Sequence, residues 1–233
     1  MPLMSLLLQI TTAATDSLAA VAPATEETLS LFDLALKGGP IMVPIALCSV
    51  IAVYIIFERY FSIRKSAKDD PNFMNNIRDF ISNGNIDAAR SLCRNTDSPI
   101  ARMIEKGISR IGKPLSDIEK AIENIGNIEV VKMEKGLSLL ATVAGAAPML
   151  GFLGTVTGMI KAFYNMSKAG KTIDISLLSG GMYEAMVTTV AGLIVGIFAL
   201  VAYNLLTAMV EKVVFKMENS SIEFMDLLQE PAK

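Results

Sequence analysis

The sequence predicts an all-α integral membrane protein with three transmembrane helices and a helical cytoplasmic domain. Of its 233 residues, 52% are hydrophobic and 19% are charged, whereas about 25% are charged in an average soluble domain. Uncharged runs occupy residues 38–57, 136–160 and 185–210, and each is as long as the roughly 20 residues that a helix needs to cross the hydrocarbon. Between the first two runs, the apolar residues of 58–135 follow helical spacing, which predicts a folded helical domain outside the bilayer.

Basic residues predict the orientation of the three helices. Lysine and arginine are enriched on the cytoplasmic side of membrane helices. On one side of the predicted spans lie Arg59, Arg64, Lys65, Lys68, Lys132, Lys135, Lys212 and Lys216. The other side carries the smaller set Lys37, Lys161, Lys168 and Lys171. The bias places the N-terminus outside and the C-terminus in the cytoplasm.

These observations divide the chain into seven expected segments. They are an outer N-terminal segment (1–37), a first transmembrane helix (38–57), a cytoplasmic helical domain (58–135), a second transmembrane helix (136–161), a short outer link (162–180), a third transmembrane helix (181–210) and a cytoplasmic C-terminal helix (211–233). We expect one unbroken helix from Ser116 into the second span. A cleaved signal peptide within residues 1–24 is an alternative. The sequence disfavours it, because no basic residues precede the apolar stretch and Asp16 interrupts that stretch.

Composition and motifs exclude most enzyme classes. The chain has no histidine and two cysteines, so it lacks the residues of common hydrolases and zinc sites. Gly107 to Pro114 resemble a phosphate-binding loop, but proline replaces the Ser/Thr that binds magnesium, and the surroundings are helical. The net charge of −2 gives no basic excess for nucleic acid. We therefore predict no enzyme, catalytic residue, metal or cofactor, and no nucleic-acid partner.

Small residues within two spans indicate close helix packing. The second span contains Gly151, Gly154 and Gly158, and the third contains Gly192 and Gly196. Spacings of four residues between small side chains allow membrane helices to approach closely. We interpret these five glycines as packing positions.

Hydroxyl and carboxyl groups at membrane depth are the candidate functional residues. Thr155, Thr188 and Thr189 lie within the spans, and Glu184 immediately precedes the third uncharged run. Many membrane threonines only bond to their own helix backbone, so that structural role is the alternative for each of them. A carboxylate beside a membrane helix is costly unless it contacts water or a partner. Glu184 is therefore a functional candidate, with an interfacial charge as its alternative.

The residues around these groups resemble a known family. The stretches AAPMLGFLGTVTGM (146–159), GMYEAMVTTVAGL (181–193) and AYN (202–204) look like the signature of the MotA/TolQ/ExbB proton-channel proteins, and are most similar to ExbB and TolQ. The resemblance implies that Thr155 and Thr189 line a pore, with Glu184 as the family's glutamate. Thr188 adds a second hydroxyl beside Thr189. Lys161 stands where the best-known members have a neutral residue, and we expect it to reach outward to the headgroups.

The resemblance also implies a function and partners. It implies a homo-oligomer, a pentamer by analogy, around a central pore in the bacterial inner membrane. An ExbD/TolR-like single-span protein would supply a carboxylate, and the pair would use proton-motive force to energise a TonB- or TolA-like protein. A structural membrane scaffold without ion transport is the alternative. The choices between TonB-like and Tol-like systems, and between H+ and Na+, remain open from the sequence.

The basic bias generates a test of orientation. A single cysteine introduced at Ser82 should be protected from an impermeant thiol reagent added outside intact cells, because residues 58–135 are predicted to lie in the cytoplasm. A cysteine at Gly170, in the short outer link, should be labelled. The opposite labelling pattern would overturn the predicted topology.

Overall fold

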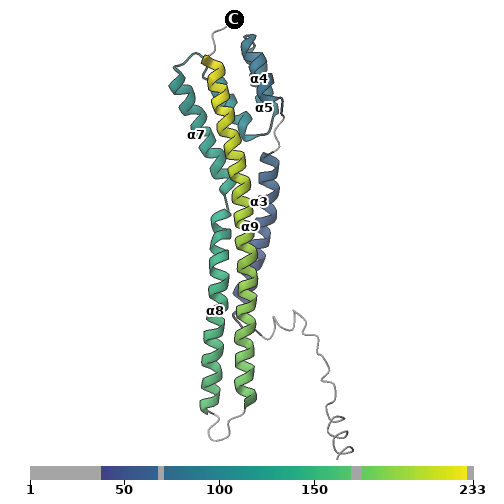
Figure 1. The fold of residues 1–233 in the computed structure, drawn as a ribbon, viewed down its shortest axis with the longest axis vertical. Helices are drawn as coiled ribbons and strands as arrows, with labels where there is room; N and C mark the ends of the chain where they lie inside the picture. The colour runs from purple at the N-terminus through teal and green to yellow at the C-terminus, as the bar shows by residue number, and fades with distance from the viewer. Residues whose placement is uncertain (1–37, 68–70, 169–174, 230–233) are drawn as a thin grey trace, which may run out of the picture. The chain divides into compact units, whose positions relative to one another are not determined.

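A computed structural model of the chain describes residues 38–67, 71–168 and 175–229, and within these ranges every regular element is a helix (Figure 1). The described helices are α3 (Met42–Ser66), α4 (Phe73–Ser82), α5 (Ile86–Asn95), α6 (Pro99–Ile108), α7 (Leu115–Glu134), α8 (Leu137–Lys168) and α9 (Ile175–Gln229). The predicted outer segment 1–37 lies outside the described residues, as do residues 169–174 of the predicted outer link.

Three helical stretches are long and apolar enough to cross a membrane. They lie within Met42–Ser66, Leu115–Lys168 and Leu178–Gln229. Their surfaces carry many exposed large apolar side chains, including Phe57 on α3, Phe152 on α8 and Phe198 on α9. Lipid is a suitable environment for such surfaces, since a water-soluble monomer rarely exposes apolar patches of this extent. The predicted all-helical membrane protein with three long apolar helices is confirmed.

The long helices α8 and α9 run side by side, and α3 packs against both of them (Figure 1). α9 is one helix of 55 residues that extends well beyond its apolar stretch. The helix predicted to continue beyond the third span is therefore present as far as Gln229, and its cytoplasmic location stays a prediction. Beyond the spans, α9 also contacts α4, α6 and α7.

The helices α4, α6 and α7 pack against the part of α9 beyond its uncharged run, and α5 packs against α4 and α6. Their buried apolar residues, with those of α9, form one core that includes Ile77, Ile104, Ile122, Val213 and Phe224. This arrangement explains the helical spacing of isoleucines in 58–135, because each short helix places its apolar stripe against the same core.

The helix expected to run unbroken from Ser116 into the second span is interrupted at Lys135 and Gly136. α7 ends at Glu134, and Gly136 has a φ of 85°, in the left-handed region that favours glycine. The Arg59 guanidinium donates a hydrogen bond of 3.2 Å to the Lys132 carbonyl at the end of α7. A carbonyl left unpaired by the end of a helix is thus satisfied by a side chain from α3.

A buried carboxylate joins α6 to α7 beside this break. Glu129 is only 3% exposed, and its two oxygens accept hydrogen bonds of 2.7 Å from Arg102 and Lys132. Burial alone would raise the pKa of the Glu129 carboxyl, but the hydrogen bonds and charges of Arg102 and Lys132 lower it below its ordinary value. The charge of Glu129 is therefore compensated on both sides.

Glycines on α8 bring its backbone against that of α9. Gly151, Gly154 and Gly158 are all buried on α8. A methyl group at Gly151 would lie 2.9 Å from the Thr188 carbonyl oxygen, and one at Gly158 would lie 3.0 Å from the Ala185 side chain. These distances leave no room for a larger residue, so the stripe of small residues sets the separation of the two helices.

Glycines on α9 complete the same contact. A methyl group at Gly192 would lie 2.5 Å from the Ala147 carbonyl oxygen, and one at Gly196 would collide with the ring of Pro148. Pro148 lacks an N–H group, so the Ala144 carbonyl loses its intrahelical donor. Gly196 therefore accommodates both the proline ring and the adjacent carbonyl.

We predict that Glu129→Gln lowers the free energy of unfolding by about 1–3 kcal/mol, because Arg102 would lose a charged partner in a buried site. The ordinary pKa is 4.5, and the native pKa is lower, so the unfolded chain binds this proton more readily. The stabilisation is present above pH 4.5 and disappears as the pH falls through the native pKa. Thermal unfolding of the detergent-solubilised protein, measured across this pH range, tests both statements.

Glu123→Gln is the matched control, since Glu123 is an exposed carboxylate on the same helix. It should leave the melting temperature nearly unchanged. Equal losses of stability in Glu123→Gln and Glu129→Gln would contradict a specific role for the buried ion pairs.

We predict that Gly192→Ala destabilises the protein by about 1–3 kcal/mol, because the added methyl group overpacks the contact between α8 and α9. Gly145→Ala on α8 is the control, since a methyl group there has no neighbouring atom within 4 Å. Gly145→Ala should be neutral or slightly stabilising, as alanine favours helix over glycine. Thermal stability and size-exclusion profiles in detergent provide the measurement; equal stability of the two variants would refute the prediction.

Candidate functional site

Thr188 is buried in the contact between α8 and α9. Its side chain is 1% exposed, and its Oγ1 donates a 2.7 Å hydrogen bond to the Ala185 carbonyl on its own helix. A methyl group at Gly154 would collide with this hydroxyl. The second hydroxyl beside Thr189 is thus fitted against a glycine of the opposite helix.

The other two candidate threonines occupy different positions. Thr189 reaches across the contact, where its Oγ1 donates a 3.0 Å hydrogen bond to the Gly151 carbonyl on α8. Thr155 donates a 2.6 Å hydrogen bond to the Phe152 carbonyl on its own helix. Both hydroxyls are partly exposed, and each retains acceptor capacity for a further donor.

Glu184 lies near the other end of the same helix contact and is paired. Its Oε2 lies 3.1 Å from the Lys161 ammonium on α8. The Glu184 side chain is 21% exposed and that of Lys161 is 61% exposed. Lys161 thus has a partner on the neighbouring helix that was not expected from the sequence, while its reach to the headgroups stays a prediction.

The chain segment before α3 covers the same carboxylate. Gly39 has a φ of 68°, a conformation that glycine adopts at little cost. A methyl group at Gly39 would collide with Oε1 of Glu184. The carboxylate is thus held between α8, α9 and the entry of α3.

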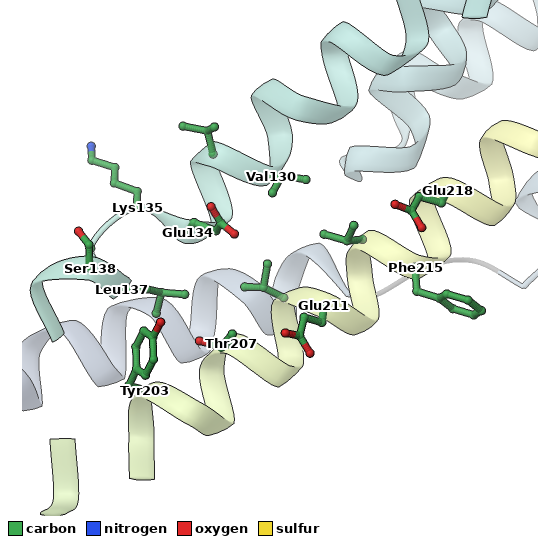
Figure 2. Close-up of a pocket in the computed structure, with 14 residues that line it drawn as sticks. Val130, Glu134, Lys135, Leu137, Ser138, Tyr203, Thr207, Glu211, Phe215 and Glu218 are labelled. Carbon is green, nitrogen blue, oxygen red and sulfur yellow. The ribbon is translucent and has the colours of Figure 1, made fainter. Parts of the chain in front are cut away.

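A groove of about 790 Å³ lies at the opposite end of the spans, where α7 gives way to α8 (Figure 2). Glu134 and Lys135 line it at the break, and Glu211 and Glu218 line it from α9. Figure 2 shows these charged side chains at its edges, while Leu137 and Tyr203 lie toward the apolar spans. The sequence analysis did not identify this groove, because it depends on the break in the helix.

The arrangement suits transfer of a small cation or proton better than covalent chemistry. Hydroxyls on α8 and α9 can donate and accept hydrogen bonds while they remain neutral, and the Glu184 carboxylate lies at the same helix contact. Residues 136–160 and 185–210 contain no charged side chain.

The Lys161 pairing and Gly39 contact were not found from the sequence, although a signal for the first was present. Lys161 ends the uncharged run 136–160, and Glu184 precedes the run 185–210. In two antiparallel helices these positions fall at the same depth, with opposite charges. The contact of Gly39 has no comparable sequence signal, since it depends on how α3 enters the bundle.

The pattern of the MotA/TolQ/ExbB proton channel family matches residues 95–219. The chain is 29% identical over 185 residues to a putative biopolymer transport protein ExbB-like 1 of Synechocystis, which covers 78% of this chain and 73% of the relative. It is 26% identical over 188 residues to the biopolymer transport protein ExbB of Neisseria meningitidis, covering 73% of this chain and 84% of the relative.

The family match includes α6, α7 and α8 and most of α9. It therefore contains the glycine contact, the three threonines and the Lys161–Glu184 pair. The matched region is more than half of the chain and coincides with the resemblance found in the sequence. The chain is a multi-pass membrane protein that belongs to the MotA/TolQ/ExbB proton channel family.

Proposed function

We propose that this chain is an inner-membrane proton-channel or motor subunit of the ExbB/TolQ type. With an ExbD/TolR-like single-span partner, it uses proton-motive force to energise a TonB- or TolA-like protein that serves outer-membrane transport or maintenance. The names of the relatives, biopolymer transport protein ExbB, support a transport role. The observation that carries the proposal is the set of polar groups at the contact of α8 with α9: Thr188 packs against Gly154, Thr189 bonds to the Gly151 carbonyl, and Glu184 pairs with Lys161. Thr155 lies on α8 beside Gly154 and bonds to its own helix.

The exposed apolar surfaces support assembly into a homo-oligomer. α8 and α9 expose large apolar side chains, such as Met149, Phe152, Met186 and Phe198, on faces that no other part of the described chain covers. Lipid and neighbouring subunits are both suitable partners for these faces. We propose a pentamer, by analogy with the family, in which α8 and α9 of each copy line a central pore.

The proposed orientation places the N-terminus in the periplasm and the helices α4 to α7 in the cytoplasm. It follows the excess of basic residues beside the inner ends of the spans. In this orientation Glu184 lies toward the periplasm, where protons enter under the membrane potential. One charge that crosses the potential releases about 2.3 kcal/mol per 100 mV, so several protons per step suffice for mechanical work.

A partner carboxylate completes the pathway in this proposal. Threonine hydroxyls do not titrate near neutral pH, so they orient water and carry no proton charge of their own. An ExbD/TolR-like helix that places an aspartate among them would supply the missing titratable group.

The structural-scaffold alternative makes a different prediction for the same residues. A scaffold needs the glycine contact, but it gains nothing from a carboxylate beside an apolar span. It predicts that Glu184, Thr155 and Thr189 tolerate substitution while assembly is preserved. Proton flux therefore separates the two functions.

We predict that Glu184→Ala lowers proton flux by at least about tenfold, because the proposed pathway loses the carboxylate at its periplasmic end. The chain is co-expressed with the product of the neighbouring gene, and flux is followed in vesicles that contain a pH-sensitive dye under an imposed potential. Glu184→Gln keeps the size and removes the charge. Low flux in Glu184→Gln would show that the pathway requires the ionised carboxylate. Full flux would show that a hydrogen-bonding group of the same size is sufficient. Full flux in Glu184→Ala, with normal assembly, would favour the scaffold.

We predict that the double variant Thr155→Val, Thr189→Val lowers flux, because valine retains the shape of threonine but lacks the hydroxyl. Serine at both positions should retain part of the flux. Thr142→Val is the control, since Thr142 is an exposed residue of α8 whose hydroxyl bonds only to the Ser138 carbonyl. Unchanged flux in the double valine variant, at normal expression, would refute the polar pathway.

A further inference from the structure

The ion pair between Lys161 and Glu184 joins two helices that are otherwise in contact through small residues. Nζ of Lys161 and Oε2 of Glu184 lie 3.1 Å apart, and the two residues are 23 positions apart in sequence. In the described part of the chain, neither residue forms another salt bridge. The pair is therefore a specific link between α8 and α9.

The two oxygens of Glu184 are held from different sides. Oε2 faces the Lys161 ammonium, and Oε1 lies against Gly39. A carboxylate fixed at both oxygens has fewer accessible rotamers than one that extends freely from a helix end. The surroundings thus define the direction in which this carboxylate points.

A pocket of about 220 Å³ lies beside the pair. Pro40 and Ile41 of the α3 entry, Thr157 and Lys161 of α8, and Glu184 and Thr188 of α9 line it. Its volume is sufficient for several water molecules, and its lining offers the polar partners that bound water requires. The pocket extends from the Lys161–Glu184 pair to Thr188.

We propose that Lys161 is a positioning residue, which holds the Glu184 carboxylate at the mouth of the ion pathway. This inference rests on the proposed function and assigns to that pathway a residue of α8. Without the ammonium, Glu184 loses its partner on α8, so its carboxylate is held less firmly beside the pocket. Misplacement of a reacting group by about 1 Å is enough to reduce a rate by as much as 100-fold.

Four variants test the inference in the intact chain, co-expressed with the neighbouring gene product. Lys161→Met removes the charge and keeps the side-chain length, whereas Lys161→Arg keeps the charge. Lys168→Met is the matched control, because Lys168 lies on the same helix and packs over Tyr164, 4.6 Å from the ring centre. Glu184→Gln reports the full effect of losing the carboxylate charge. The probe is proton flux into dye-loaded vesicles under an imposed potential.

The expected result is a decrease of at least about tenfold for Lys161→Met, with flux retained in Lys161→Arg and Lys168→Met. Rescue by arginine distinguishes positioning by charge from a requirement for lysine packing. Full flux in Lys161→Met, together with low flux in Glu184→Gln, would overturn this inference and leave the proposed function intact. Full flux in Glu184→Gln would instead remove ionised Glu184 from the pathway, and this inference with it.

Thermal stability supplies a measurement that is independent of flux. In a double-mutant cycle of Lys161→Met and Glu184→Gln, residues that interact directly give non-additive changes. Additive changes would overturn the pairing. If Lys161→Met does not assemble, the exchange of charges decides: recovery of assembly by Glu184→Lys in the Lys161→Glu background supports the pair, and no recovery overturns it.

Discussion

The close approach of α8 and α9 is the constraint on which the rest of the structure depends. In lipid, the hydrophobic effect does not drive helices together, so the contact requires dense packing and hydrogen bonds. Gly151 and Gly192 bring the two backbones to the distance at which Thr189 reaches the Gly151 carbonyl. The same approach places Thr188 against Gly154 and brings Lys161 within reach of Glu184. The packing residues and the candidate ion pathway are therefore parts of one contact.

Outside the spans, charges take the place of small residues in holding helices together. Glu129 binds Arg102 on α6, and Arg59 on α3 binds the carbonyl of Lys132. Both contacts lie beside the break at Gly136, where backbone hydrogen bonding along α7 stops. These side chains support the junction between the apolar and polar parts of the bundle, since an unsupported helix end would leave carbonyls without donors. α9 needs no such support, because it continues as one helix to Gln229.

The sequence predicts the helical elements better than their ends. Uncharged runs indicate which residues can lie in the membrane, but they do not show where a helix ends. α3 therefore continues to Ser66 and α9 to Gln229, both beyond the uncharged runs. The break at Gly136 was missed because one glycine in a helical pattern is compatible with either a helix or a turn. Among the candidate site residues, Thr155, Thr189 and Glu184 were identified as polar groups at membrane depth, and the family motif then implied their roles. The contacts of Lys161 and Gly39 were not predicted, because they depend on tertiary structure.

The cost of the polar groups favours ion transport over a structural scaffold. Helix packing alone is satisfied by glycine and alanine, as at Gly158 and Ala185. A lone carboxylate beside an apolar span is destabilising, and an ion pair recovers only part of the cost of removing both charges from water. A scaffold with an alanine at Glu184 and a neutral residue at Lys161 would avoid that cost entirely. The two charges, with the hydroxyls of the adjoining helix contact, therefore fit the polar pathway that we propose better than a contact that serves packing alone.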